Sequence, residues 1–273
     1  MISAQVAIVR FRRDVLIGRV ARVGMFVLLV AAVASMGQSD TSLGLGVVGG
    51  AMLLGFIVLE GYRYSKFSRQ AADWPAMIAT GRFEQAERQI DSSLRSFSIY
   101  RGAKLLGLHN LAMLRHAQQR WDEAAILCRA LLDQQMAMAR SLAKPSRLLL
   151  ADSLLQVGDL NGAYEALSRL YEQRLSLAEA MTLLQLQLEY SWRVGAHAAM
   201  VWGLAAKIQL AELMPALSAA RTQAYLALAA HRLGQTELAD WLGQRVKLLV
   251  DAEKFAAEMP GIGEVWNATP AKT

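Results

Sequence analysis

The amino-acid sequence predicts an all-α protein, in which an N-terminal pair of transmembrane helices is followed by an α-solenoid of helix-turn-helix repeats. Three observations support this prediction. Two charge-free apolar runs, residues 23–36 and 43–59, lie between basic segments near the N-terminus. A short turn motif recurs about every 38 residues from residue 81 to residue 236. Almost no stretch after residue 70 alternates apolar and polar residues with the period of two that is typical of a strand.

The composition excludes several classes of protein. Of the 273 residues, 54% are hydrophobic and 19% are charged, and a chain this apolar is not intrinsically disordered. Its one cysteine, Cys128, excludes a disulfide framework, a cysteine-based zinc site and an iron–sulfur cluster.

The positive charge is concentrated at the N-terminus. The net charge is +6, which by itself raises the question of nucleic-acid binding. Residues 1–69 contain eight of the basic residues and three of the acidic ones, so the remainder of the chain is nearly neutral. This distribution predicts that nucleic acid is not a partner.

The two apolar runs predict a transmembrane hairpin over residues 20–61, with helices over about 20–36 and 43–60, after a basic N-terminus over 1–19. Basic residues flank the outer ends of the pair of runs, whereas Asp40 is the one charged residue of the connecting loop. The positive-inside rule then places the N-terminus and the downstream domain in the cytoplasm. We therefore expect an integral protein of a bacterial inner membrane, with the lipid bilayer as a partner.

The second run contains closely spaced glycines. Residues 44–49 match the G-x-G-x-x-G pattern of dinucleotide-binding turns, but no strand precedes them and no acidic residue follows at the expected distance. Gly46, Gly49 and Gly50 instead predict close packing against another transmembrane helix. The alternative is that these glycines are simply tolerated in a membrane helix.

The first run also has features of a signal peptide. Residues 32–34 are Ala-Val-Ala, which fits a cleavage site before Ser35. If cleavage occurred, the second run would still act as an anchor and the downstream domain would stay cytoplasmic. Both alternatives remain open at this point.

After residue 70 the chain consists of helical segments joined by a recurring turn. The turns are spaced 38, 39, 37 and 39 residues apart, and this regularity predicts repeated helix hairpins. Each copy sets a small or aliphatic residue three positions into the second helix, as in Gly81-Arg82-Phe83 with Ala86, Gln119-Arg120-Trp121 with Ala124, Gly158-Asp159-Leu160 with Ala163, Gly195-Ala196-His197 with Ala199 or Met200, and Gly234-Gln235-Thr236 with Ala239.

This pattern resembles the tetratricopeptide repeat (TPR). The residues that carry the resemblance are a Leu-Ala pair on the first helix, the turn residue and the Ala of the second helix, found as Leu111, Ala112, Trp121 and Ala124, as Leu150, Ala151, Gly158 and Ala163, and as Leu226, Ala227, Gly234 and Ala239. The resemblance implies a TPR-like domain over residues 62–258. The tail over residues 259–273 has no periodicity, which predicts a flexible segment, and the alternative is that Val265 and Trp266 dock back onto the domain. The period of about 38 exceeds the family's 34, so related helical arrays remain open.

The titratable residues do not predict an active site. The four histidines lack the spacing of a metal site, and the apolar neighbours of Cys128 predict a buried thiol. We therefore expect a protein that is not an enzyme and that has no cofactor, metal or catalytic residue.

The resemblance to the TPR family implies a groove that binds a protein partner. The positions that face the groove in that family correspond here to His109, Met113, His116, Asp152, Gln156, Glu189, Trp192, Arg193, Arg221, His231 and Arg232. The alternative for each is an ordinary solvated helix face. The leading hypothesis is a membrane-anchored, non-enzymatic scaffold or adaptor. The alternative is a structural or assembly subunit of a larger membrane complex that packs through the hairpin, and both homo- and hetero-oligomers fit the sequence.

Overall fold

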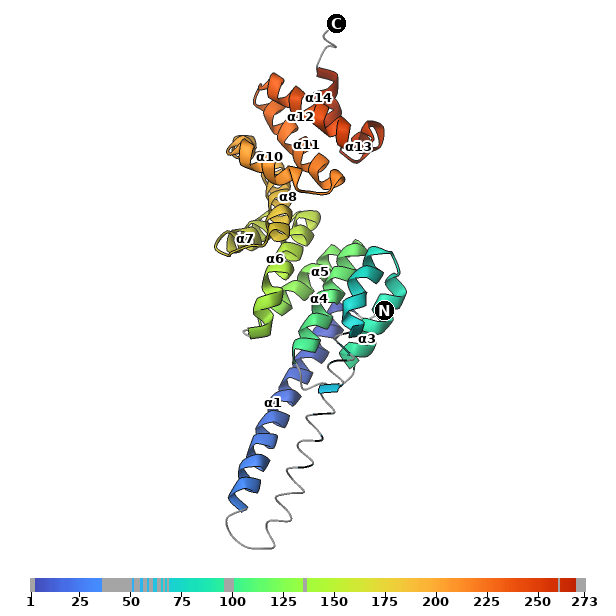
Figure 1. The fold of residues 1–273 in the computed structure, drawn as a ribbon, viewed down its shortest axis with the longest axis vertical. Helices are drawn as coiled ribbons and strands as arrows, with labels where there is room; N and C mark the ends of the chain where they lie inside the picture. Colours follow the sequence, from blue (N-terminus) through green and yellow to red (C-terminus); the bar gives the residue numbers. More distant parts are fainter. Residues whose placement is uncertain are drawn as a thin grey trace. The chain divides into compact units, whose positions relative to one another are not determined.

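The computed structural model describes residues 3–35, 69–95, 101–134, 137–259 and 261–268, together with isolated positions between 51 and 67 (Figure 1). No residue in these ranges forms a strand, and the predicted all-α class is confirmed. Residues 69–79 are helical, and the labelled helices are α1 (Ala4–Ser35), α3 (Phe83–Arg95), α4 (Arg101–Ala117), α5 (Trp121–Leu132), α6 (Ala137–Val157), α7 (Leu160–Tyr171), α8 (Leu177–Arg193), α9 (His197–Val201), α10 (Leu204–Glu212), α11 (Ala216–Arg232), α12 (Thr236–Leu249), α13 (Ala252–Glu258) and α14 (Ile262–Ala268).

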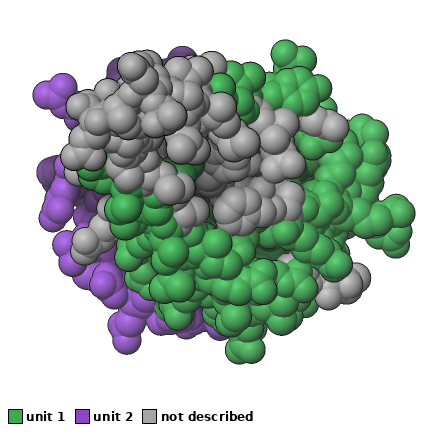
Figure 2. Space-filling view, turned by 90° about the horizontal axis from the view of Figure 1, so that it is seen from below, with its two compact units in different colours: residues 1–153 green, residues 154–273 purple. Residues whose placement is uncertain are grey.

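The chain forms two compact units, residues 1–153 and residues 154–273, which are coloured separately in Figure 2. In the first unit, α3 packs on α4 and α4 packs on α5, around buried side chains such as Ile90, Leu111 and Leu127. The N-terminal half of α1 lies beside these helices (Figure 1) and buries Ala7 and Phe11 against them.

Helix α11 is the centre of the second unit. It packs against α8, α9, α10, α12 and α14, and its buried face is rich in alanine, including Ala220, Ala224 and Ala227. Small side chains allow helix axes to approach closely, so one helix can contact several neighbours. Apolar residues of α12, among them Leu242 and Val246, complete this core.

The turn motif recurs in the backbone as well as in the sequence. In each of the five copies the turn residue has a left-handed backbone, with φ between +60° and +87°. Its N–H donates to the carbonyl three residues earlier, and the next N–H donates to the carbonyl five residues earlier. These bonds satisfy the free carbonyls at the end of the first helix. The residue five positions after the turn residue is buried in every copy, as Ala86, Ala124, Ala163, Met200 and Ala239.

The membrane prediction requires correction. Among the described residues, no helix combines enough length with enough apolar character to cross a bilayer. The transmembrane helix expected over residues 20–36 belongs instead to α1, which begins at Ala4 and includes five arginines and Asp14. Its charge-free part, Val23 to Ser35, rises only about 20 Å, whereas a bilayer core is about 30 Å thick.

This finding on the described residues contradicts the expected location in a bacterial inner membrane and the description as an integral membrane protein. The loop after α1, most of the second apolar run, and the packing glycines Gly46, Gly49 and Gly50 lie outside the described residues.

Within the expected tail, Val265 and Trp266 dock back onto the second unit, which is the alternative that the sequence left open. Residues 262–268 form α14, which buries Ile262 and Val265 against the second unit. The indole N–H of Trp266 donates to the carbonyl of Gly243 over 3.2 Å. A side chain at Gly243 would come within 3.3 Å of both Trp266 and Val265, so glycine at this position allows α14 to lie close to α12.

Candidate protein-binding surfaces

In the first unit, two of the predicted groove histidines have partners on α6. His116 Nε2 lies 3.0 Å from Asp152 Oδ2, and its ring meets the ring of Trp121 edge-on at 4.5 Å. His109 is buried, and its Nδ1 lies 2.9 Å from Ser146 Oγ. Burial lowers the pKa of His109 to about 4, because the charged imidazolium would lose its hydration. Met113 lies between the two histidines on α4 and is partly buried.

In the second unit, a second group of predicted groove residues joins α6 to α8. Glu189 Oε1 accepts hydrogen bonds from Arg193 over 2.5 Å and from Gln156 over 3.3 Å. Arg193 also donates to the carbonyl of Leu155, and the ring of Trp192 packs on that of His197 at 5.0 Å.

The remaining predicted arginines contact the end of the chain. Arg221 pairs with Glu258 of α13 over 2.8 Å, and Arg232 pairs with Glu264 of α14 over 3.1 Å. His231 lies next to Arg232 and is partly buried. The predicted groove residues thus form separate contacts. In most of these contacts the two partners lie about one repeat apart in the sequence. These pairs link neighbouring helices, which gives the side chains a structural role.

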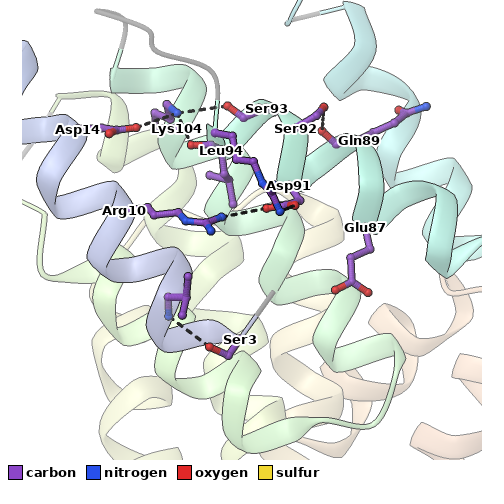
Figure 3. A network of polar contacts seen from close by, with 12 residues as sticks. Ser3, Arg10, Asp14, Glu87, Gln89, Asp91, Ser92, Ser93, Leu94 and Lys104 are labelled. Carbon is purple, nitrogen blue, oxygen red and sulfur yellow. Dashed lines mark hydrogen bonds and ion pairs between the residues drawn. The ribbon is translucent and has the colours of Figure 1, made fainter. Parts of the chain in front are cut away.

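Within the first unit, a network of charged side chains attaches α1 to α3 and α4 (Figure 3). Asp14 Oδ2 lies 3.0 Å from Lys104 Nζ, and Arg10 Nη1 lies 3.2 Å from Asp91 Oδ1. Lys104 also donates to the carbonyl of Leu94 over 2.6 Å. Burial lowers the pKa of Lys104, and the neighbouring Asp14 carboxylate opposes that shift.

Sequence analysis did not identify this attachment, because residues 1–19 were interpreted only as a basic N-terminus. One signal for it was present. Ala4, Ala7, Phe11 and Asp14 are spaced so that they share one face of a helix, and all four are buried.

Three tyrosines on α7 and α8, Tyr164, Tyr171 and Tyr190, form a cluster of partly exposed aromatic rings. The rings of Tyr164 and Tyr190 stack with their centroids 5.8 Å apart. Partial burial and the phenol groups of Tyr164 and Tyr190 raise the pKa of Tyr171. Tyr164 remains 56% exposed and Tyr171 53% exposed. We call these three residues the tyrosine cluster. Sequence analysis missed it, although Tyr164 and Tyr171 lie two turns apart on one helix.

Among the described residues, no group of three or more His, Cys, Asp or Glu side chains is arranged to hold a metal ion. Cys128 is buried as its neighbours predict, and burial raises its pKa to about 12, so it is a thiol at neutral pH.

Comparison of the chain with protein-family models, with curated proteins and with solved structures gave no match.

Proposed function

We propose that this chain is a non-enzymatic scaffold or adaptor whose array of TPR-like helix hairpins binds a protein partner. The observation that carries this proposal is the fivefold recurrence of one turn, with a left-handed residue at the same position, the same two backbone hydrogen bonds and the same buried position. In helical-repeat proteins each hairpin buries its apolar face on its neighbours, and the stack presents an extended surface to a ligand.

The tyrosine cluster is the proposed contact surface of this adaptor. A tyrosine offers a large apolar ring and a hydroxyl group, and it loses little side-chain entropy on binding. Aromatic residues are enriched at protein interfaces, and tyrosine is among the residues that dominate their affinity. The stack between Tyr164 and Tyr190 fixes two of the rings before a partner arrives.

Affinity capture with the immobilised full-length chain tests this proposal. The test variant is Tyr164→Ala together with Tyr171→Ala, and the matched control is Trp202→Ala, which removes an exposed aromatic residue elsewhere in the same unit. We expect a protein to be retained by the unaltered chain and by the control, and to be lost from the tyrosine variant. If the unaltered chain retains no protein specifically, the adaptor function is wrong.

A further variant distinguishes the tyrosine cluster from the groove implied by the family resemblance. Trp192→Ala together with Arg193→Ala alters the groove side of α8 and leaves the tyrosine cluster unchanged. We expect this variant to retain the partner. If it loses the partner while the tyrosine variant keeps it, the partner binds along the groove and the tyrosine cluster is the wrong surface.

A further inference from the structure

The fourth helix hairpin differs from the others in its second helix. Helices α3, α5, α7 and α12 run without interruption for 12 to 14 residues. In the fourth hairpin α9 ends after five residues, and Gly203, with φ +68°, separates it from α10. Any other residue would be strained at this φ. The break therefore uses a backbone conformation that glycine adopts easily.

The repeat register identifies a residue that conflicts with a continuous helix in this hairpin. In α5, α7 and α12 the position twelve residues after the left-handed turn residue is buried, as Leu131, Leu170 and Val246. The equivalent position of the fourth hairpin is occupied by Lys207. It follows the buried Met200 by seven residues, which is about two helical turns. A continuous helix would therefore direct Lys207 toward the same buried face as Met200.

A lysine on that face would be costly. Met200 belongs to an apolar core that includes Leu184, Leu188 and Ala220. An ammonium group loses its hydration in such a core, so a charged side chain is buried only where polar partners compensate for the loss. Lys207 thus opposes a continuous helix, whereas the leucine or valine at this position in the other hairpins favours one.

The break gives the Lys207 ammonium group polar partners. Lys207 Nζ donates to the carbonyls of Ala199 over 2.9 Å, and of Met200 and Trp202 over 2.8 Å each. In a continuous helix each of these carbonyls would accept from the N–H group four residues later. The ammonium group therefore takes the place of three backbone donors at the interruption. Burial lowers the pKa of Lys207, because the cation gives up part of its hydration there.

We infer that the charge of Lys207 latches the fourth hairpin in its interrupted form, and that α9 and α10 become one helix when this charge is removed. Two forms of one segment then compete. In the interrupted form the ammonium group satisfies three carbonyls and Gly203 is left-handed. In the continuous form backbone N–H groups satisfy these carbonyls, and residues 197–212 repeat the geometry of α5, α7 and α12.

The latch fixes the contacts of α10 within the second unit. Helix α10 packs on α8 and α11, and its Ala211 is fully buried. At the end of the helix Glu212 pairs with Arg245 of α12 over 2.7 Å. A continuous helix would instead extend along the axis of α9, so these contacts would change. The Lys207 side chain is thus a conformational device that sets the position of α10.

Thermal unfolding of the full-length chain tests the latch through the sign of one substitution. In the unaltered chain Gly203→Ala should lower the melting temperature, because alanine is strained at φ +68°. In the Lys207→Met chain the same substitution should raise the melting temperature, because alanine stabilises a continuous helix relative to glycine. Gly234→Ala is the matched control, since Gly234 has φ +74° in an ordinary turn, and it should be destabilising in both chains. A Gly203→Ala effect of the same sign in both chains would overturn the inference.

Hydrogen exchange measured by mass spectrometry follows the helix directly. The amides of residues 203–206 should exchange at least about tenfold more slowly in Lys207→Met than in the unaltered chain, because a continuous helix supplies their acceptors. Lys254→Met is the matched control, since Lys254 is exposed and lies on α13, and it should leave these amides unchanged. Equal exchange of residues 203–206 in Lys207→Met and the unaltered chain would contradict the latch. A Lys207→Met chain that fails to fold would contradict it too, because the continuous form accommodates methionine at this position.

Discussion

Arg115 shows how one residue holds three helices together. Its side chain is fully buried on α4, where Nη2 lies 2.8 Å from Glu87 Oε1 of α3 and Nε lies 3.2 Å from Glu123 Oε2 of α5. Nη1 also donates to Gln118 over 2.6 Å. A buried guanidinium is tolerated only when its donors are paired in this way. Removal of the cation would leave the buried Glu87 carboxylate without this partner.

We therefore predict that Arg115→Ala lowers the free energy of unfolding by about 3–5 kcal/mol. Arg120→Ala is a matched control, because Arg120 also pairs with Glu123 but is about one-third exposed. Loss of the Arg120 side chain should lower the free energy of unfolding by less than about 1 kcal/mol. Urea unfolding followed by circular dichroism measures both changes, and similar losses in the two variants would show that the buried network does not stabilise the fold.

His109 gives a pH dependence whose direction follows from its environment. Burial lowers its pKa in the folded chain to about 4, whereas an unfolded histidine titrates near 6.5. The unfolded chain therefore binds the proton at higher pH than the folded chain does. The resulting stability is complete above about pH 6.5 and decreases as the pH falls toward 4, by about 3 kcal/mol in total. Between pH 7 and pH 4, the measured free energy of unfolding should fall more steeply in the unaltered chain than in the His109→Gln variant. Parallel profiles would contradict the assignment.

At the scale of the element, the left-handed turn residue sets the geometry of each hairpin. Glycine adopts positive φ without steric cost, whereas other residues pay about 1–2 kcal/mol. Gly158 has φ +87°, and Gln119 occupies the equivalent position with φ +60°. We predict that Gly158→Ala lowers the free energy of unfolding by about 1–2 kcal/mol, and that Gln119→Gly raises it by up to about 1 kcal/mol. Thermal unfolding measures both, and a stabilising Gly158→Ala would rule out strain at the turn.

The turns were the part of the fold that the sequence predicted best, because their residues are local and recur at a regular spacing. The attachment of α1 was not predictable in this way, since Asp14 and Lys104 lie far apart in the sequence. The transmembrane prediction treated the first apolar run separately from the charged residues that precede it in the same helix. The tyrosine cluster depends on the packing of α7 against α8, which brings Tyr190 to Tyr164. Periodicity identifies a helix face but does not identify its neighbour.

At the scale of the whole molecule, the two compact units predict two steps of unfolding. Residues 1–153 and 154–273 each have their own buried core, and the boundary between them falls within α6. Contacts in helical-repeat chains are mostly between neighbouring elements, so a local loss of packing need not spread along the chain. Leu111 is fully buried in the first unit and Leu242 in the second.

We predict that Leu111→Ala and Leu242→Ala each cost about 2–5 kcal/mol and act on different parts of the chain. Hydrogen exchange measured by mass spectrometry should show faster exchange over α4 and α5 in Leu111→Ala, with α11 and α12 unchanged. The opposite pattern should hold for Leu242→Ala. If each substitution accelerated exchange equally in both pairs of helices, the prediction of two steps would be wrong. The two units would then unfold as one cooperative body, with α6 transmitting the loss of packing across the boundary.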